Sequence, residues 1–363
     1  LASYLKDTFP RYQTMLGKKV ERVFGWDCHG LPAEMGVEKE SGISGRKSIE
    51  KYGIEKFNNL CKESVMKYVG EWKTYINRLG RWVNFDNGYK TMNLNYMESV
   101  IWVFKQLYDK GLLYEDYRVM PYSWTCQTPV SNAETKQDDS YRDKADKAIT
   151  VKFKLESVPN FIADQFKEID KVFALAWTTT PWTLPSNLAL AVNAEFNYVL
   201  VEKNKEYFII AKELLPKYKK ELARENEKFN ILLEFKGEKL IGLHYEPLLP
   251  YLKKLPEVEA SESAFSILHG EYVTITDGTG IVHTAPGFGE DDNMVCRAAG
   301  IPTVCPIDDA GNFIAPIDEF LGQQVFETND KIIIKLKEEN KWLKTEQYIH
   351  KYPHCWRTDA PLI

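Results

Sequence analysis

Several features that mark large classes of protein are missing from this sequence. No two cysteines form a Cys-x-x-Cys pair, and the six thiols are scattered over 363 residues, which excludes a disulfide framework and fits a reducing, intracellular location. No apolar run approaches the ~20 residues that a bilayer-spanning helix needs, and the N-terminus has no signal-peptide core. We therefore expect a cytoplasmic protein with no membrane partner. The cysteines are Cys28, Cys61, Cys126, Cys296, Cys305 and Cys355.

An excess of basic charge is also missing. Lysine and arginine number 47 against 52 aspartates and glutamates, for a net charge of −5. Proteins that bind nucleic acid non-specifically are normally basic, so any RNA contact must come from a local patch. The 44% hydrophobic and 27% charged residues are ordinary globular proportions and exclude disorder, collagen and coiled coil. At roughly 150 residues per domain, the length predicts about two domains.

The hydrophobic pattern changes along the chain. Apolar residues recur at spacings of three and four over residues 55–79 and 96–110, which predicts two long helices whose apolar stripes belong to the core. A polar stretch over 136–147 indicates a boundary, after which short β-type runs predict a mainly β unit with a solvated helix over 212–228 and a last helix over about 329–343. The predicted strands are 149–155, 172–177, 188–192, 198–201, 207–211, 272–276 and 280–284.

The first segment that could carry chemistry is Gly-Trp-Asp-Cys-His-Gly-Leu-Pro at residues 25–32. Two glycines and a proline around Asp27 and His29 predict a turn at a strand end, where backbone can approach a ligand closely. The carboxylate could hold an ammonium group, and Trp26 could wall a small apolar pocket. A structural turn with a capping aspartate explains the same residues equally well.

A second segment, residues 177–187, contains three consecutive threonines followed by Pro-Trp-Thr-Leu-Pro. Prolines restrict the backbone, so the hydroxyls of Thr178, Thr179 and Thr180 are expected in an irregular, pre-set loop. Such a loop offers donors and acceptors to a polar ligand or to a positioned water. The alternative is an edge strand that runs into a rigid turn.

A third segment, residues 277–292, predicts a hairpin turn, a β-run that ends at His283, a glycine loop and an acidic cluster at a helix start. Carboxylates at a helix N-terminus suit the macrodipole, which accounts for the cluster without any ligand. The alternative is that Asp292 faces a pocket shared with His283 and the threonines, and binds a substrate ammonium. A metal site has the least support, because His269 is the nearest other histidine and no metal-type histidine spacing occurs.

Together these segments resemble the isoleucyl branch of the class I aminoacyl-tRNA synthetases, over essentially the whole chain. The motif at 25–32 has the residues typical of the isoleucine branch, and the valine and leucine branches carry different residues there. Residues 80–91, 97–107 and 119–123 continue the resemblance. Tyr-Pro-His-Cys-Trp-Arg at 352–357 resembles the point where the chain re-enters the catalytic domain.

The resemblance implies an α/β architecture in which residues 1–139 form the first part of a Rossmann-like nucleotide-binding domain. A mainly β, barrel-like editing domain would be inserted over 140–349, and 350–363 would return to the catalytic domain. The parent enzyme would activate isoleucine with ATP and Mg²⁺ and charge tRNA(Ile), as a cytoplasmic monomer.

The two ATP motifs of the family, His-x-Gly-His and Lys-Met-Ser-Lys-Ser, do not occur in this sequence. We therefore expect the chain to be an excerpt of a longer protein. By itself it would retain at most the hydrolysis of mischarged aminoacyl-tRNA esters.

The resemblance also assigns roles at the synthetic site. Asp27 is expected to hold the ammonium group of isoleucine, because opposite charges attract strongly in a partly dry cleft. Trp26 and His29 would shape that end of the site.

In the editing domain, the resemblance gives Asp292 the ammonium group of a valyl ester. Thr178, Thr179 and Thr180 would bind the ester and the terminal adenosine and help to place the attacking water. His283 would shape the side-chain end of the pocket and exclude isoleucine.

Some members of the family hold zinc with two Cys-x-x-Cys pairs at the entry and exit of the insertion. The corresponding positions here read Ser123-x-x-Cys126 and Cys355-x-x-Thr358. Half of the thiolates are missing and a hydroxyl is a poor zinc ligand, so no structural zinc is expected.

Three other functions are open to the same sequence: a valyl or leucyl sibling, a free-standing deacylase that edits in trans, and a non-catalytic RNA-binding module. The motif at residues 28–32 differs from the corresponding motifs of the valine and leucine enzymes, which argues against a sibling enzyme. The first 134 residues read as half a nucleotide fold, which a free-standing deacylase does not need. The acidic balance and the lack of a basic aromatic motif argue against an RNA-binding module.

Overall fold

The computed structural model describes residues 2–137, 139–224 and 228–363. It divides into two compact units, Leu1–Asp116 (unit 1) and Tyr117–Ile363 (unit 2). This division precedes residue 139, where the resemblance places the end of the catalytic segment, and that family boundary stays a prediction. In the part of the chain that is described, no helix has both the length and the apolar character to cross a membrane.

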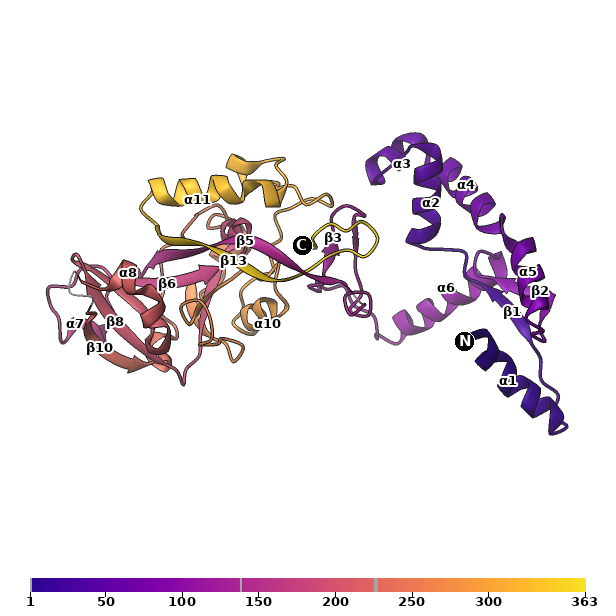
Figure 1. Ribbon diagram of the computed structural model, residues 1–363. Helices are drawn as coiled ribbons and strands as arrows, with labels where there is room; N and C mark the ends of the chain where they lie inside the picture. Colours follow the sequence, from indigo (N-terminus) through magenta and orange to yellow (C-terminus); the bar gives the residue numbers. More distant parts are fainter. Residues whose placement is uncertain (1, 138, 225–227) are drawn as a thin grey trace. The chain divides into compact units, whose positions relative to one another are not determined.

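Unit 1 is built on two parallel strands, β1 (Val23–Trp26) and β2 (Asn84–Lys90). Parallel strands need a crossover connection, and helices α2 to α5 supply it (Figure 1). This arrangement confirms the α/β organisation predicted for the start of the chain. The helices are α1 (Ala2–Met15), α2 (Leu31–Ser41), α3 (Arg46–Tyr52), α4 (Ile54–Met66), α5 (Val69–Arg78) and α6 (Leu94–Asp109).

Two predictions for unit 1 need correction. The helix predicted over 55–79 is two helices, because Tyr68 leaves the helical backbone region at φ −102° and ψ 8°. The helix predicted over 96–110 is present as α6, but α6 has no buried residue, and Ile101 and Trp102 are 68% and 62% exposed. Its apolar stripe is therefore not core, because the described residues of unit 1 supply no layer that buries it.

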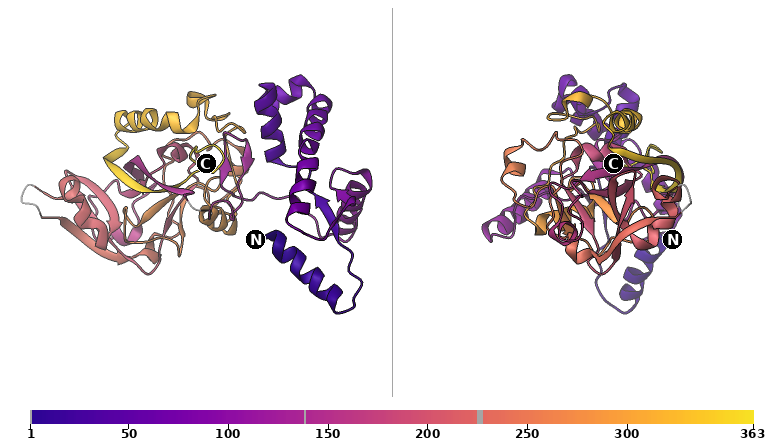
Figure 2. Two further views of the ribbon diagram at one scale, coloured as in Figure 1. Left: turned by 45° about the vertical axis from the view of Figure 1, so that its right-hand side comes forward. Right: turned by 90° about the vertical axis from the view of Figure 1, so that its left-hand side faces the viewer.

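Unit 2 contains a nine-stranded mixed sheet with β6 (Phe173–Thr178) at its centre. Strand β5 pairs along one edge of β6, while the other edge pairs with β9 at its start and with β12 at its end. The sheet is curled (Figure 2). Its buried side chains form the largest part of the core. The other strands are β5 (Tyr141–Lys154), β7 (Ala189–Val192), β8 (Asn197–Lys203), β9 (Glu206–Ala211), β10 (Asn230–Lys236), β11 (Ser266–His269), β12 (Ile281–Thr284) and β13 (Trp342–Pro353).

The longest pairing in the sheet joins β5 to β13. The two strands run antiparallel from Val151 opposite Trp342 to Tyr141 opposite Pro353. The chain therefore enters and leaves the sheet through adjacent strands. A short hairpin precedes β5 and consists of β3 (Tyr122–Ser123) and β4 (Thr128–Pro129). The family boundary placed between residues 349 and 350 falls inside β13.

Six of the seven predicted strands coincide with strands of this sheet. The seventh, over 272–276, is wrong: these residues form a loop, in which the ring of Tyr272 packs over Gly270. β10, β11 and β13 were not predicted.

Two helices predicted for unit 2 are shorter in the structure. The last one, α11, spans Asn329–Glu338, and the chain is back in a strand by Trp342. The helix predicted over 212–228 is a 3₁₀ helix, Lys212–Tyr218, followed by α8 (Lys219–Leu222), and residues 225–227 lie outside the described part.

A substitution in the turn before β12 can test how closely the strands of this sheet pack. Gly280 has φ +75°, and a Cβ added there would lie 2.4 Å from the Cβ of Ala211. We expect Gly280→Ala to lower the free energy of unfolding by about 2–5 kcal/mol, from left-handed strain plus overpacking. Gly322, with φ +73° and open space around it, is the matched control, and Gly322→Ala should cost about 1–2 kcal/mol. Urea unfolding followed by circular dichroism measures both, and equal losses would contradict the close contact.

Candidate functional site

The predicted residues of unit 1 lie on the turn that follows β1. Trp26 ends the strand, opposite Lys90 of β2, and its ring packs 4.7 Å from the ring of Phe24. Asp27 and His29 are exposed, and the backbone N–H of His29 lies 3.5 Å from Oδ1 of Asp27. The structure therefore places all three on one short turn.

Thr91, which sequence reasoning missed, organises this turn from the end of β2. Its hydroxyl accepts a hydrogen bond from the N–H of Cys28 at 2.8 Å and lies 3.3 Å from Nδ1 of His29. Its own N–H donates to the carbonyl of Trp26. Parallel pairing brings Thr91 here, and parallel pairing leaves no local signal in the sequence.

In unit 2 the threonine segment forms a chain of hydroxyls. Oγ1 of Thr178, at the end of β6, lies 3.2 Å from Oγ1 of Thr180, which lies 3.3 Å from Oγ1 of Thr183. The backbone beyond Thr180 is a 3₁₀ helix, Pro181–Ser186, and not the irregular loop predicted. Three residues make one turn of such a helix, so Thr180 and Thr183 face the same side. Thr179, between Thr178 and Thr180, is half-buried.

His283 joins this chain from β12. Its ring is buried, and Nε2 lies 2.7 Å from Oγ1 of Thr183. Burial lowers the pKa of His283 to about 4, so the imidazole is neutral at neutral pH. The structure thus joins His283 to the threonine segment through Thr183, a residue that was not among the predicted site residues.

Two further residues fix the tautomer of His283. The amide Nδ2 of Asn187 donates to the carbonyl of Ala189 and lies 3.3 Å from Nδ1 of the imidazole, and the hydroxyl of Tyr245 donates to Oδ1 of Asn187 at 2.7 Å. Since Nδ1 accepts from the amide, the proton is assigned to Nε2, which donates to Thr183. An imidazole with both nitrogens engaged is a rigid wall rather than a proton acceptor.

Asp292 lies in the first turn of α10 (Glu290–Ala298), and its side chain turns back toward the end of β12. Oδ2 accepts from the N–H of Ala285 at 2.9 Å, and the hydroxyl of Tyr272 lies 3.4 Å from Oδ1. Ala285 lies two residues after His283, so the carboxylate is anchored at the end of the strand that carries the imidazole. Asp292 is half-buried and does not project into bulk solvent.

The surroundings of Asp292 shape its chemistry. A Cβ on Gly289 would lie 2.8 Å from Cγ of Asp292, so the glycine leaves the space that the carboxylate occupies. Burial raises the pKa of Asp292 to about 6. At neutral pH the group is mostly ionised, yet its charge is poorly solvated, and such a carboxylate gains by meeting a cation. Tyr272 was missed because its segment was read as a strand.

The four positions where some family members hold zinc come together at the start and end of unit 2. Burial opposes ionisation of Cys355, but hydrogen bonds from Ser123, Thr358 and two backbone N–H groups outweigh it and lower the pKa of this thiol. Burial raises the pKa of Cys126. Two thiols and two hydroxyls are a poor zinc donor set. The donor set therefore does not fit a zinc ion.

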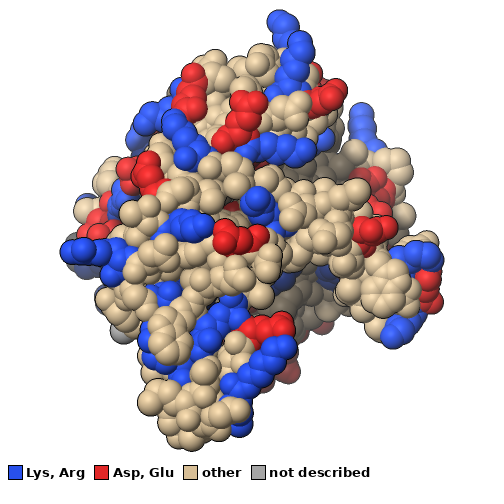
Figure 3. Space-filling model, turned by 90° about the vertical axis from the view of Figure 1, so that its right-hand side faces the viewer, with Lys and Arg blue, Asp and Glu red and all other residues tan. Residues whose placement is uncertain are grey.

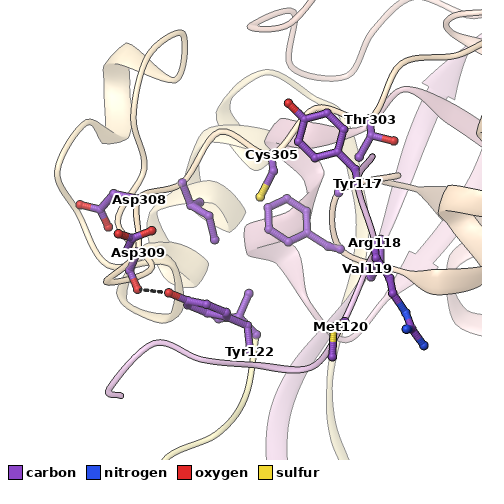
Figure 4. Close-up of a pocket in the computed structure, with 13 residues that line it drawn as sticks. Tyr117, Arg118, Val119, Met120, Tyr122, Thr303, Cys305, Asp308 and Asp309 are labelled. Atoms are coloured by element: carbon purple, nitrogen blue, oxygen red, sulfur yellow. Dashed lines mark hydrogen bonds between the residues drawn. The ribbon is translucent and has the colours of Figure 1, made fainter. Parts of the chain in front are cut away.

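The glycine loop that comes after β12 also borders a cavity of about 250 Å³ (Figure 4). The hydroxyl of Tyr122 donates to the carbonyl of Asp309 across its rim, and burial raises the pKa of Tyr122 to about 12. Phe288 lines this cavity and also packs edge-on against Trp182, 5.0 Å away. None of the predicted site residues is among the described residues that line this cavity. The lining residues are Tyr117, Arg118, Val119, Met120, Tyr122, Gly287, Phe288, Thr303, Cys305, Ile307, Asp308, Asp309 and Ile363.

Charged side chains of both signs are mixed on one face of the molecule. On the face drawn in Figure 3, basic and acidic side chains are interspersed with uncharged areas. Many of the lysines lie beside carboxylates, as in the ion pairs Lys212–Glu234 and Lys351–Asp143.

The raised pKa of Asp292 predicts an effect on stability. A carboxyl whose pKa rises from 3.8 to about 6 on folding destabilises the folded state increasingly as pH rises through that window. Asp292→Asn should therefore raise the free energy of unfolding at pH 7 by about 1–3 kcal/mol, and the gain should disappear below pH ~4.

Urea unfolding at several pH values measures this effect. His283 works in the opposite sense, because its lowered pKa removes stability as pH falls from 6.5 to about 4, but it is common to both proteins and cancels. The exposed neighbour Asp291 supplies the matched control, Asp291→Asn, which should change little. A loss of stability in Asp292→Asn at pH 7 would contradict the burial described.

Comparison with known proteins places the chain in a family. The family model described as tRNA synthetases class I (I, L, M and V) matches residues 1–353. A protein named isoleucine–tRNA ligase from Rickettsia peacockii (strain Rustic) is 57% identical over 364 residues, and one from Rickettsia bellii (strain OSU 85-389) is 52% identical over 402 residues. Each alignment covers all of this chain, but 32% and 36% of those relatives, so the chain spans about a third of their length.

Solved structures give weaker matches. A structure titled GlLeuRS-CP1 matches with 18% identity and a TM-score of 0.41, covering 55% of this chain and 99% of that one. The P. knowlesi cytosolic leucyl-tRNA synthetase editing domain matches with 13% identity and a TM-score of 0.41, covering 58% and 98%. The family model spans nearly the whole sequence, and on that ground this chain belongs to the class I tRNA synthetases of the isoleucine, leucine, methionine and valine group.

Proposed function

We propose that this chain is part of an isoleucine–tRNA ligase and that residues 140–349 hydrolyse valyl-tRNA(Ile). The relatives named isoleucine–tRNA ligase, at 52–57% identity over the whole chain, support the amino acid. The observation that carries the hydrolytic part is the junction of two distant segments at β12. There the buried His283 meets the threonine chain, and the same strand end anchors the carboxylate of Asp292.

The parent enzyme would join isoleucine to tRNA(Ile) with ATP and Mg²⁺, as a monomer in the cytoplasm. Asp27 would hold the ammonium group of isoleucine, with Trp26 and His29 beside it on the same turn. The family's two ATP motifs are not among these residues. The proposed hydrolytic step consumes water and no nucleotide.

The need for a second site arises from the size of valine, which is one methylene smaller than isoleucine. A methylene contributes only about 1–3 kcal/mol in a hydrophobic pocket, a figure established on this very enzyme family. A synthetic pocket built for isoleucine therefore admits valine at an appreciable rate. A site that accepts the valyl ester and excludes the isoleucyl ester removes the error.

At that site, the poorly solvated carboxylate of Asp292 would pair with the α-ammonium of the valyl group. Thr178, Thr179 and Thr180 would hold the ester and orient a water. The water oxygen adds to the ester carbonyl, the bond to the ribose oxygen breaks, and valine and the free ribose hydroxyl leave, with the proton passing to solvent. Aminoacyl esters are already activated, so positioning supplies much of the rate.

His283 would act as the selective wall of this site. Its ring is neutral and held through both nitrogens, so it offers shape rather than a base. A rigid wall discriminates by overlap with the larger side chain, whereas a mobile ring would yield to the extra methylene.

The role of Asp292 is tested by Asp292→Ala. We expect the hydrolysis of valyl-tRNA(Ile) to fall by about 100-fold or more, because a desolvated charge pair is lost. Asp291→Ala is the control and should keep most of the rate. In the unmodified protein, the rate should fall as pH drops below about 6, where Asp292 becomes protonated. Undiminished hydrolysis in the Asp292 variant would remove this residue from the site.

The role of His283 is tested by His283→Ala, assayed on valyl-tRNA(Ile) and isoleucyl-tRNA(Ile) side by side. Removing the wall should let the isoleucyl ester be cleaved, while the valyl ester stays a substrate. The matched variant is His269→Ala, which changes a histidine at the end of β11. If the His283 variant still spares isoleucyl-tRNA(Ile), the wall lies elsewhere.

A further inference from the structure

Two thiols from distant parts of the chain meet where unit 2 begins and ends. Cys126 lies in the turn between β3 and β4, and Cys355 comes just after the end of β13. Cys355 is 1% exposed and forms a small apolar cluster with Val130 and Leu362, against which Cys126 packs. The two thiols therefore lie in the same small apolar cluster.

The turns that carry these thiols are fastened together by other contacts. Oγ1 of Thr125 lies 2.8 Å from Oγ1 of Thr358, and the indole N–H of Trp124 donates to the carbonyl of Pro361. The N–H of Leu362 donates to the carbonyl of Pro353. The two turns are thus held against each other by the surrounding structure, and both cysteines lie in the cluster between them.

We propose that Cys126 and Cys355 form a reversible disulfide, which takes the place of the zinc that some family members hold at these positions. The donor set of this chain disfavours the ion, while the two thiols that remain lie in one apolar cluster. Two thiols that can form a disulfide therefore occupy positions at which a zinc site would need two more thiolates.

The environment of the pair gives each thiol a part in the reaction. Cys126 is partly exposed and can meet an oxidant, whereas Cys355 is buried in the cluster against which Cys126 packs. A thiolate is the nucleophile in disulfide exchange.

The oxidant is a small-molecule disulfide, R–S–S–R. The thiolate of Cys126 attacks one of its sulfur atoms and releases R–S⁻, leaving a mixed disulfide on Cys126. The thiolate of Cys355 then attacks the Cys126 sulfur and releases the second R–S⁻. The two protein thiols lose two protons and two electrons, and R–S–S–R takes them up to become two R–SH.

The bond would close a loop that contains everything from β4 to β13. Cross-linking the ends of a long loop restricts the unfolded chain, so the oxidised unit should resist unfolding more than the reduced one. The pair would thereby fasten the entry and the exit of the sheet to each other.

The test equilibrates the full chain in glutathione buffers of graded reduced-to-oxidised ratio, quenches with acid, alkylates the free thiols and maps the peptides by mass spectrometry. We expect a Cys126–Cys355 cross-linked peptide in oxidising buffer, with alkylation of both thiols falling by about tenfold, and full return in reducing buffer. Cys126→Ser and Cys355→Ser should each abolish the cross-link. Cys61→Ser, which changes a partly exposed thiol in unit 1, should leave it intact.

Three results would overturn the proposal: both thiols alkylated at every ratio, a glutathione adduct on Cys126 that never yields the cross-link, or stoichiometric zinc in the purified chain that Cys126→Ser removes. Thermal unfolding gives a second readout. Oxidation should raise the unfolding midpoint of unit 2 in the unmodified chain and in Cys61→Ser, but not in Cys126→Ser. An unchanged midpoint in cross-linked protein would contradict the fastening role.

Discussion

The antiparallel pairing of β5 with β13 is the constraint on which unit 2 depends. It brings Tyr141 opposite Pro353, residues far apart in the chain, so that the sheet begins and ends at the same place. Closing so long a loop is entropically costly, and the ladder of backbone hydrogen bonds together with the core on β5 offsets that cost. Since β5 also pairs with β6, the same ladder fixes the strand whose end carries Thr178.

The strands that pair with β6 also position the candidate site. β12 pairs with both β6 and β7, which places His283 against the 3₁₀ helix that carries Thr183. The helix is buried and holds two prolines, so its hydroxyls stay in place without a ligand. Preorganised hydroxyls and a fixed imidazole suit a reaction in which positioning matters more than proton transfer.

The two titratable groups of the candidate site lower the stability of the folded state. His283 is held neutral by burial, and Asp292 carries its charge in a place that favours the protonated form. Both groups make the folded state less stable at some pH than an apolar core would be. Strain of this electrostatic kind is expected where a protein must bind a cation, since a well-solvated carboxylate gains less from the encounter.

In unit 1 the apolar periodicity of a helix does not coincide with burial. Helix α6 has the periodicity of a core helix, yet its apolar face is exposed in the described structure. An amphipathic pattern indicates that one face of a helix needs an apolar partner, but it does not indicate which segment of the protein supplies that partner. The correction at α6 and the break between α4 and α5 are both matters of packing rather than of local propensity.

The sequence by itself determined the α/β start, the mainly β character of the second unit, six of the seven predicted strands and the segments that hold the candidate site. These are properties of local periodicity, of glycine and proline placement, and of side-chain chemistry within a few residues. Only the tertiary structure decided that β5 and β13 pair and that Cys126 packs against the apolar cluster of Cys355. It also decided which further residues contact the two candidate sites: Thr91, Thr183, Asn187, Tyr245 and Tyr272. The reason is physical: these contacts join residues across strands, turns and loops, and a strand's partner depends on the free energy of the whole sheet rather than on the strand's own residues.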